Sequence, residues 1–298
     1  DTMIVKNFLM RGKALQPDLL GDKQTGLFVP IGDVQWGAPD FPEGKFTDFL
    51  HWVVDRNGYL VGMGDFMDFS SFTDRRTMAP LRDSTREVLD GMIRDKLDKL
   101  IKMVAFTKGR WVGFLEGNHR WTFRDGHSTE QYIAAALGSD FLGTMAFLRL
   151  IPEGRPKKAH DADTIVCLHH GYGGARTAGP RLINLERLVE GWEADLYLMG
   201  HDHSDVHEST DRMYCSPPGA KQVMYRRRKV FARTGNWMRS CTAMEPQPID
   251  APASDSRGGY AEEKAFTPKA IGAPFFVLGY DEIDKTGYYR PLVGYGRF

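Results

Sequence analysis

Five apolar runs are each followed at once by a short polar cluster, and this arrangement constrains the fold more than any other feature of the sequence. The apolar runs cover residues 27–31, 59–63, 111–115, 165–168 and 196–199. Short apolar runs bounded by turn-forming residues are typical of buried β-strands. Open α/β sheets bind ligands beyond the carboxyl ends of their strands. The sequence therefore predicts an α/β protein in which the polar clusters gather at one edge of a sheet.

The polar clusters are rich in carboxylate, amide and imidazole groups: Asp33-Val34-Gln35, Gly64-Asp65-Phe66-Met67-Asp68, Gly117-Asn118-His119, His169-His170-Gly171 and Gly200-His201-Asp202-His203. Taken alone, an aspartate at the end of a strand is more often a turn residue than a metal ligand. His201 and His203 are two residues apart, so on an extended chain their side chains point to the same side. Together the oxygen and nitrogen donors suit two divalent metal ions that share one carboxylate.

Helical patterns lie between the predicted strands. Apolar residues recur at helical spacing over residues 46–54 and stop at Asn57-Gly58, and a second pattern over 129–137 stops at Gly138. Ser84 with Glu87 resembles a capping box at the start of a long helix that runs to Val104. Residues 181–192 form a further helical pattern. This alternation of strand and helix favours an α/β over an α+β fold.

The two ends of the chain have weaker patterns. Residues 1–24 show no clear period, and we expect an extension packed against a single domain formed by residues 25–298. After residue 204, turn formers separate short β-prone pieces at 223–225, 230–232 and 275–278. Residues 245–259 are rich in Pro, Ala, Ser and Gly, which predicts a surface loop.

Composition sets outer bounds on function. The 298 residues are 42% hydrophobic and 26% charged, which is ordinary for a soluble globular protein. The formal net charge is zero, so no global attraction to nucleic acid or to an anionic membrane is expected. No apolar run approaches the roughly 20 residues that span a bilayer, so we expect no membrane partner. The three cysteines have no paired spacing, which favours reduced thiols and a cytoplasmic location.

In this order, the five polar motifs resemble the signature of the calcineurin-like metallophosphoesterase superfamily, which runs DxH, GDxxD, GNH(D/E), a strand-end His and GHxH. The likeness extends from Asp33 to His203. It implies a four-layer α/β fold in which two mixed β-sheets pack as a sandwich flanked by helices, with residues after 204 completing the second sheet. Two positions depart from the pattern: Gln35 replaces a histidine, and Arg120 replaces an acid.

The tail also resembles superfamily members encoded by phages and prophages. The shared features are the Arg-Thr-Gly-Asn turn at 233–236 and the Tyr-Ala-Glu-x-Lys stretch at 260–264. If the chain is phage-encoded, the expected location is the cytoplasm of the host cell.

The resemblance implies a set of metal ligands. Asp65 would bridge two divalent ions, with manganese expected first and zinc, ferrous iron or nickel as alternatives. The other ligands would be Asp33, Gln35 and His203 at the first ion, and Asn118, His169 and His201 at the second. His169 and His170 are adjacent and point to opposite faces of a strand. Superfamily members generally use the first of two such residues, which favours His169 and leaves His170 as an outer or substrate contact.

Further residues receive catalytic or substrate-binding roles. In the superfamily, the histidine that corresponds to His119 protonates the leaving-group oxygen or stabilises its charge. Asp68 would orient a ligand. Arg120 and Arg176 are candidates for gripping substrate phosphate, although an arginine beside a turn is as often simply solvated.

The function implied is a dinuclear metal-dependent phosphoester hydrolase, a phosphodiesterase or nuclease that uses a metal-bridging hydroxide. A phosphomonoesterase is one alternative, because the motifs do not separate the two. A catalytically weakened metal- or nucleic-acid-binding module is another, and Gln35 supports it. The basic run Arg226-Arg227-Arg228-Lys229 follows Tyr225 and favours DNA or RNA as substrate, whereas most charge runs are solvated faces. The oligomeric state is not predicted.

Overall fold

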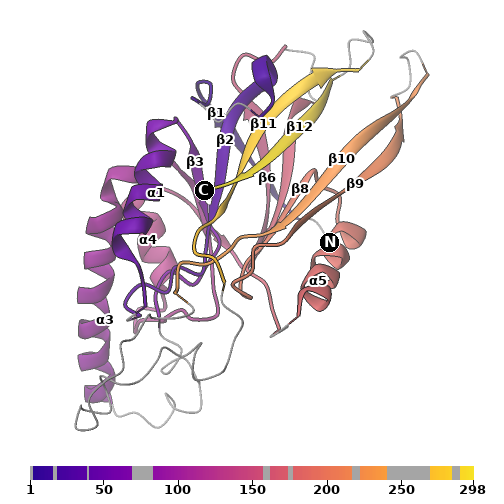
Figure 1. Ribbon diagram of the computed structural model, residues 1–298. Coiled ribbons are helices and arrows are strands. Elements are labelled where there is room, and N and C mark those ends of the chain that lie inside the picture. Colours follow the sequence, from indigo (N-terminus) through magenta and orange to yellow (C-terminus); the bar gives the residue numbers. More distant parts are fainter. Residues whose placement is uncertain are drawn as a thin grey trace, which may run out of the picture.

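The computed structural model describes residues 3–15, 19–38, 40–68, 83–156, 162–173, 177–216, 222–239, 269–283 and 289–298. In these residues the chain is an α/β protein with two mixed six-stranded β-sheets and four α-helices (Figure 1). Sheet A has the strand order β1 (Val5–Met10), β6 (Met145–Pro152), β7 (Thr164–His169), β8 (Leu196–Met199), β10 (Met224–Arg233) and β9 (His207–Cys215). Sheet B has the order β12 (Tyr289–Arg297), β11 (Pro274–Glu282), β2 (Gln24–Ile31), β3 (Tyr59–Gly62), β4 (Trp111–Leu115) and β5 (Phe141–Gly143).

All five apolar runs predicted as strands are strands, namely β2, β3, β4, β7 and β8. Strand β3 pairs in parallel with β2 and β4, and β7 pairs in parallel with β8. Because parallel neighbours point the same way, the carboxyl ends of these strands meet at one edge of each sheet. The predicted α/β class is therefore confirmed.

The four predicted helices are also present: α1 (Glu43–Asp55), α3 (Asp83–Val104), α4 (Thr129–Leu137) and α5 (Ala178–Gly191). Two short 3₁₀ helices cover Gly21–Lys23 and Ala105–Thr107. Helix α4 begins with a capping box in which Ser128 and Gln131 each accept from the other's backbone N–H, and it ends at Gly138 in a left-handed conformation. The capping box expected at Ser84 lies outside the described side chains.

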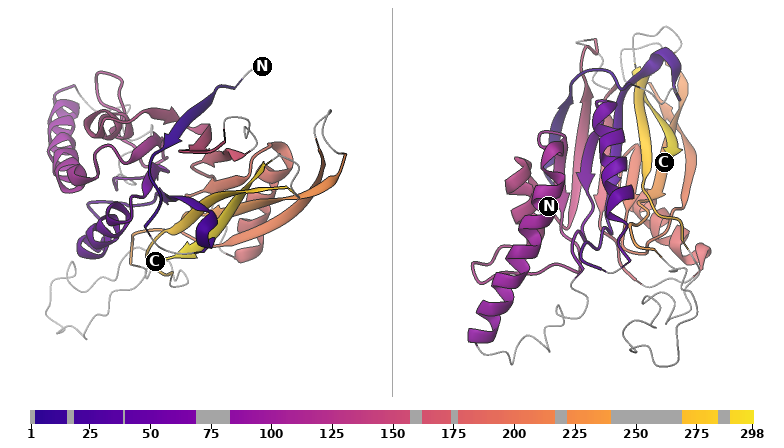
Figure 2. Two further views of the ribbon diagram at one scale, coloured as in Figure 1. Left: turned by 90° about the horizontal axis from the view of Figure 1, so that it is seen from above. Right: turned by 60° about the vertical axis from the view of Figure 1, so that its left-hand side comes forward.

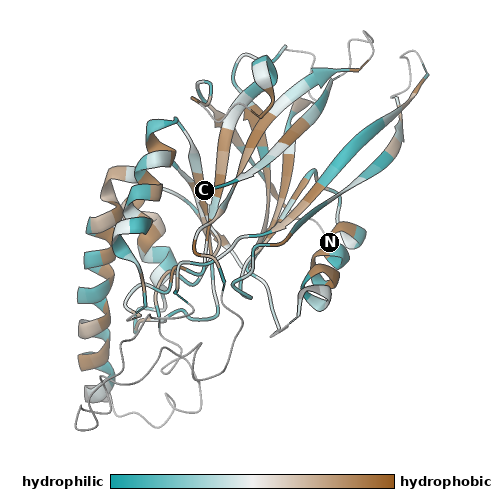
Figure 3. Cartoon of the chain, viewed as in Figure 1, coloured by the Kyte–Doolittle hydropathy of each residue, from teal (hydrophilic) through white to brown (hydrophobic). Residues whose placement is uncertain are grey.

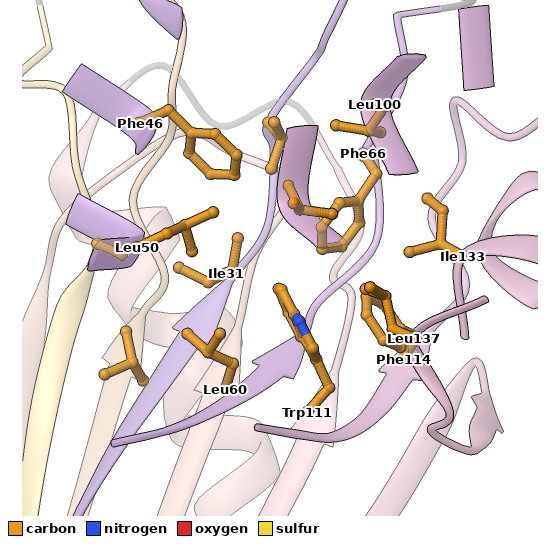
Figure 4. Close-up of a cluster of buried hydrophobic side chains, with 14 of the residues drawn as sticks. Ile31, Phe46, Leu50, Leu60, Phe66, Leu100, Trp111, Phe114, Ile133 and Leu137 are labelled. Atoms are coloured by element: carbon orange, nitrogen blue, oxygen red, sulfur yellow. The ribbon is translucent and has the colours of Figure 1, made fainter. Parts of the chain in front are cut away.

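Three apolar layers hold the elements together. Helices α1, α3 and α4 pack on the outer face of sheet B, where Phe46, Leu100 and Ile133 belong to the same buried cluster as Trp111 and Phe114 (Figure 4). Helix α5 packs on the outer face of sheet A, against β7, β8 and β10. Figure 2 shows the two sheets between these helices. The residues that face each other between the sheets form a third cluster, which we call the inter-sheet core.

The inter-sheet core follows strand alternation. Val166 and Leu168 of β7 and Leu196 and Leu198 of β8 face sheet B and are fully buried. The intervening residues of these strands, such as Cys167, face α5 instead. Figure 3 shows the resulting hydrophobic bands along the central strands. Alternate residues of β7 and β8 therefore face the other sheet, and the residues between them face α5.

The ends of the chain contribute more to the sheets than the sequence suggested. Within the expected extension, Val5–Met10 is a strand, β1, which pairs in parallel with β6 at the edge of sheet A. Its alternate residues Lys6, Phe8 and Met10 are the more buried ones. The residues after 204 supply β9 and β10 to sheet A and β11 and β12 to sheet B, whereas the sequence suggested that they complete only the second sheet. Apart from residue 223, the β-prone pieces at 223–225 and 230–232 belong to one long strand, β10, and the piece at 275–278 belongs to β11. The loop predicted at 245–259 lies outside the described residues.

The described part of the chain contains no helix with both the length and the apolar character of a membrane-spanning segment.

Candidate metal centre

Two loops of sheet B continue side by side beyond the ends of β2 and β3. The N–H of Asp33 donates to the carbonyl oxygen of Gly64 (3.1 Å), and the N–H of Gln35 donates to that of Asp65 (3.0 Å). The loops thus extend the parallel pairing of the two strands by several residues. As a result, the first two predicted motifs lie against each other at the edge of the sheet.

A tight polar group forms around Asp65. Its Oδ2 atom lies 3.3 Å from His170 Nε2, and His170 Nε2 lies 2.8 Å from Asn118 Oδ1. His201 Nδ1 lies 2.6 Å from the same Asn118 oxygen. The ligand atoms of Asp65, His170 and His201 all lie within 4.8 Å of one another. Four loops from two sheets thus direct oxygen and nitrogen donors toward one point, as a divalent cation requires.

His170, rather than the expected His169, lies in this group, so the geometry favours His170 as the candidate ligand. His169 is the last residue of β7, and strand alternation places it on the same side as Cys167, which faces α5. The same alternation places His170 on the side of Val166 and Leu168, which face the space between the sheets. The Nδ1 atom of His169 accepts a hydrogen bond from the N–H of Gly171 instead (2.8 Å). Residues 165–168 are all apolar because both faces of β7 are covered, so the sequence does not reveal which face is the inner one.

The orientation of the His170 ring is typical of a metal ligand. Its Nδ1 atom lies 2.7 Å from the carbonyl oxygen of Met63. A proton on Nδ1 would be donated to that carbonyl, which leaves Nε2 directed at Asp65 and Asn118. Metal-binding histidines usually donate their second ring N–H to a backbone carbonyl or a carboxylate in this way.

A second group surrounds Asp33. Asp33 Oδ1 lies 3.4 Å from His203 Nε2, and Asp33 Oδ2 accepts from the N–H of His201 (2.9 Å). Gln35 Nε2 lies 3.5 Å from Asp65 Oδ2, which links the two groups. Asp33 Oδ1 and Gln35 Oε1 are buried oxygens without a hydrogen-bond partner among the described residues. Because a buried unpaired oxygen is costly, these atoms fit a cation better than an empty environment.

The loops that carry the predicted metal ligands, which we call the ligand loops, have strained backbone conformations. Among the described residues, the non-glycine positions with a positive φ are Asn57 and five members of the site: Asp33, Gln35, Asp65, His201 and His203. Such conformations cost on the order of 1–3 kcal/mol each and cluster at functional sites. The strain is therefore concentrated where the predicted ligands lie.

Close packing of two glycines allows Asp65 to reach the centre of the site. A Cβ on Gly64 (φ +92°) would lie 2.7 Å from both the Gly117 backbone and His170 Nδ1. A Cβ on Gly117 would overlap the carboxylate and the backbone N of Asp65. The N–H of His119 donates to Asp65 Oδ1 (2.8 Å), so the third motif is hydrogen-bonded to the second.

Charge coupling within the site is strong. Burial raises the pKa of Asp65, but the hydrogen bond to His170 and the charges of His170 and His119 lower it to about 2. Burial lowers the pKa of His170, whereas the Asp65 carboxylate raises it to about 9. Burial and the neighbouring His170 lower the pKa of His201. In the metal-free protein, a proton on His170 thus supplies the positive charge that Asp65 attracts.

His119 and Asp68 lie at the rim of this group. Their Nδ1 and Oδ1 atoms are 4.0 Å apart, an ion-pair distance rather than a hydrogen bond. Burial lowers the pKa of His119, but the carboxylates of Asp68, Asp65 and Asp33 outweigh burial and raise it. The surrounding carboxylates therefore favour the protonated form of the His119 ring.

The predicted substrate-binding arginines are not supported by contacts in the site. Arg120 Nε lies 3.3 Å from Glu116, and its NH1 group donates to the carbonyl oxygen of Gly117 (3.0 Å). Both contacts are to residues three or four positions earlier in the chain. Arg176 lies outside the described residues.

The four cations of the basic run on β10 are paired with three carboxylates. Arg227 makes two hydrogen bonds to Asp195 (2.5 and 2.8 Å), and the buried Lys229 pairs with Glu193. On the other face, Arg226 and Arg228 lie 3.4 and 3.3 Å from Asp211. Strand alternation thus divides the run between two faces, one with Asp195 and Glu193 and the other with Asp211 alone. This division and pairing reduce the charge that the run could offer to a nucleic acid.

Comparison of the sequence with protein-family models finds no match, and comparison with curated proteins finds none either. The interpretation of function therefore rests on the geometry of the site and on the motifs of the sequence.

The Asp65–His170 pair predicts a pH-dependent stability of the metal-free protein. A pKa raised from 6.5 to about 9 on folding means that the stabilisation from His170 is complete below pH 6.5. It is then lost as the pH rises through 9. We expect urea unfolding in EDTA to show falling stability between pH 6.5 and 9. The control is His170→Gln, which cannot titrate and should flatten this part of the profile. An equal fall in parent and variant would contradict the assignment.

Proposed function

We propose that this chain is a dinuclear metal-dependent phosphoester hydrolase of the calcineurin-like metallophosphoesterase superfamily. The convergence of Asp65 with Asn118, His170 and His201 carries the proposal, because four loops from two sheets supply these side chains. The order of helices, sheet B, sheet A and helix is consistent with the four-layer fold of that superfamily. The order of the five motifs along the chain supports the same conclusion.

The donor set assigns residues to two cations. Asp65 would be shared, with Asn118, His170 and His201 at one ion, and Asp33, Gln35 and His203 at the other. The unpaired buried oxygens of Asp33 and Gln35 support this second set. Carboxylate, amide and imidazole donors fit Mn²⁺, Zn²⁺ or Fe²⁺. When bound, two such ions supply Lewis acidity: they lower the pKa of water and neutralise charge on a phosphoryl group.

The protein's own contribution to the reaction centres on His119. The nearby carboxylates raise the pKa of His119 against the effect of burial, and Asp68 at 4.0 Å stabilises the protonated ring. The side chain is partly exposed, so a leaving group can reach it. His119 would donate its proton to the leaving oxygen as the phosphoester bond breaks. Asp65 fixes the position of His119 through its backbone N–H.

The substrate is a phosphoester that reaches this rim, and a phosphodiester is the first candidate. Metal-dependent binding without turnover is the second function, and it is favoured by Gln35. An amide oxygen is a weaker metal donor than imidazole, so the Asp33 group would hold its ion less tightly. Turnover assays separate the two functions.

The first test measures hydrolysis of bis-p-nitrophenyl phosphate and p-nitrophenyl phosphate with added Mn²⁺. We expect turnover that EDTA abolishes, with the diester cleaved faster. Asp65→Asn should lose both turnover and bound metal, because it removes the charge shared by the two ions. The exposed Asp55→Asn is the control and should behave like the parent. Metal binding without turnover in the parent would favour the binding function.

A matched pair of variants tests the histidine assignment. His170→Ala should lose at least one of two bound Mn²⁺ ions, because it deletes the ring that faces Asp65 and Asn118. His169→Ala should keep both ions, because its ring faces Gly171 and Tyr172. Metal stoichiometry after equilibrium dialysis is the measurement. The reverse result would restore His169 as the ligand.

The role of His119 is tested through the leaving group. His119→Ala should retain bound metal and lower turnover by roughly 10²–10⁴-fold for esters with poor leaving groups. The loss should be smaller for p-nitrophenyl esters, whose leaving oxygen needs little protonation. His127→Ala, an exposed histidine on a neighbouring loop, is the control. Equal losses for both kinds of ester would argue against proton donation.

A further inference from the structure

The Arg-Thr-Gly-Asn turn begins at the last residue of β10, and almost every one of its residues contacts the ligand loops or the residues beside them. We call residues 233–237 the clamp segment. Four of its backbone N–H groups donate to carbonyl oxygens in or beside those loops: Arg233 to Val206 (2.7 Å), Thr234 to Met199 (3.1 Å), Gly235 to Ser204 (2.9 Å) and Trp237 to Asp33 (3.1 Å). The loop that carries His201 and His203 is therefore held on both sides, and the same segment reaches Asp33 in the other sheet.

The side chain of Arg233 strengthens this hold. It is 1% exposed, and its two terminal groups donate to the carbonyl oxygens of Gly200 and Arg181 (3.0 Å each). Its Nε atom lies 3.3 Å from Asp202 Oδ2. Asp202 is the residue between His201 and His203. One guanidinium thus connects the start of this loop, its middle and the first turn of α5, which only a planar group with several donors can do.

The other end of the clamp segment is anchored to sheet B. Gly235 has φ +78°, and a Cβ there would overlap the carbonyl oxygen of Gly272. Asn236 and Gly272 exchange backbone hydrogen bonds of 3.2 and 2.8 Å, just before β11. Asn236 Nδ2 also donates to the carbonyl oxygen of His203 (3.3 Å).

Trp237 completes the anchor. It is buried against Phe46 and Phe49 of α1, with ring centroids 4.9 and 5.1 Å away. The clamp segment therefore runs from β10 in sheet A to the helical side of sheet B.

We propose that the clamp segment is a positioning element, with Arg233 as its main side chain, that holds Asp33, His201 and His203 in their metal-binding conformation. These three residues have positive φ angles of 50°, 74° and 54°. Such backbone conformations persist only where contacts with the surrounding residues hold them in place. The hydrogen bonds of the clamp segment supply that constraint without contacting a metal. This inference rests on the proposed metal centre.

The test compares two arginines of the same strand. Arg233→Met should bind Mn²⁺ about 10–100-fold more weakly than the parent, which is the usual effect of losing a group that holds the metal ligands in position. Arg227→Met is the matched control, because it also removes an arginine paired with a carboxylate, Asp195, but away from the site. It should lower the melting temperature and leave Mn²⁺ affinity unchanged. Calorimetric titration of each metal-free protein gives the affinity, and the Mn²⁺ electron paramagnetic resonance spectrum reports the ligand geometry.

Two milder variants keep the test decisive if Arg233→Met does not fold. Arg233→Lys keeps the charge but cannot make all three contacts, so it should recover only part of the affinity. Asn236→Ala removes the bond to His203 and should also weaken binding. Parent-like affinity in both variants, or an equal loss in Arg227→Met, would overturn the positioning role. A parent that binds no Mn²⁺ would instead overturn the proposed function, and this inference with it.

Discussion

The inter-sheet core is the contact on which the candidate site depends. Sheet B supplies Asp33, Asp65 and Asn118 from the loops after β2, β3 and β4, whereas sheet A supplies the histidines after β7 and β8. Neither sheet alone carries a complete set of donors. The packed apolar faces fix how far the two strand edges can shift, because close-packed interiors have few alternative arrangements. Hydrogen-bond distances such as 2.8 Å between His170 and Asn118 therefore depend on contacts well away from the site.

Local backbone preference and site geometry conflict at the ligand loops, and the surrounding structure resolves the conflict. A positive φ is uncommon outside glycine, although aspartate and histidine tolerate it better than most residues, and Asp65 and His201 adopt it. Gly64 and Gly200, which precede them, have no Cβ and so allow the neighbouring loops to approach closely. Backbone hydrogen bonds between neighbouring loops then fix the result. Violations of local rules at a few positions, supported by rigid neighbours, are characteristic of functional sites.

The charges show why a linear pattern can mislead. Residues 226–229 are a continuous basic run in sequence, but in β10 alternate side chains face opposite sides. Arg227 and Lys229 meet Asp195 and Glu193, and the other two meet Asp211. The charge available to a ligand depends on such pairing, because an ion pair has a much weaker field than a lone cation. Arg120 is similar, since Glu116 engages it beside the site.

The sequence by itself determined the secondary structure around the site and the loops that carry its donors. Hydrophobic periodicity depends on neighbours along the chain, so β2, β3, β4, β7, β8 and the four helices could be predicted from it. The tertiary structure decided what depends on distant residues. It brought His170 rather than His169 next to Asp65 and Asn118, since this depends on which face of β7 meets the other sheet. It also made Val5–Met10 a strand, because its partner β6 lies about 140 residues away, and it placed Arg233 behind the histidine loop. Periodicity fixes two faces for each element, but only packing decides which of them is inside.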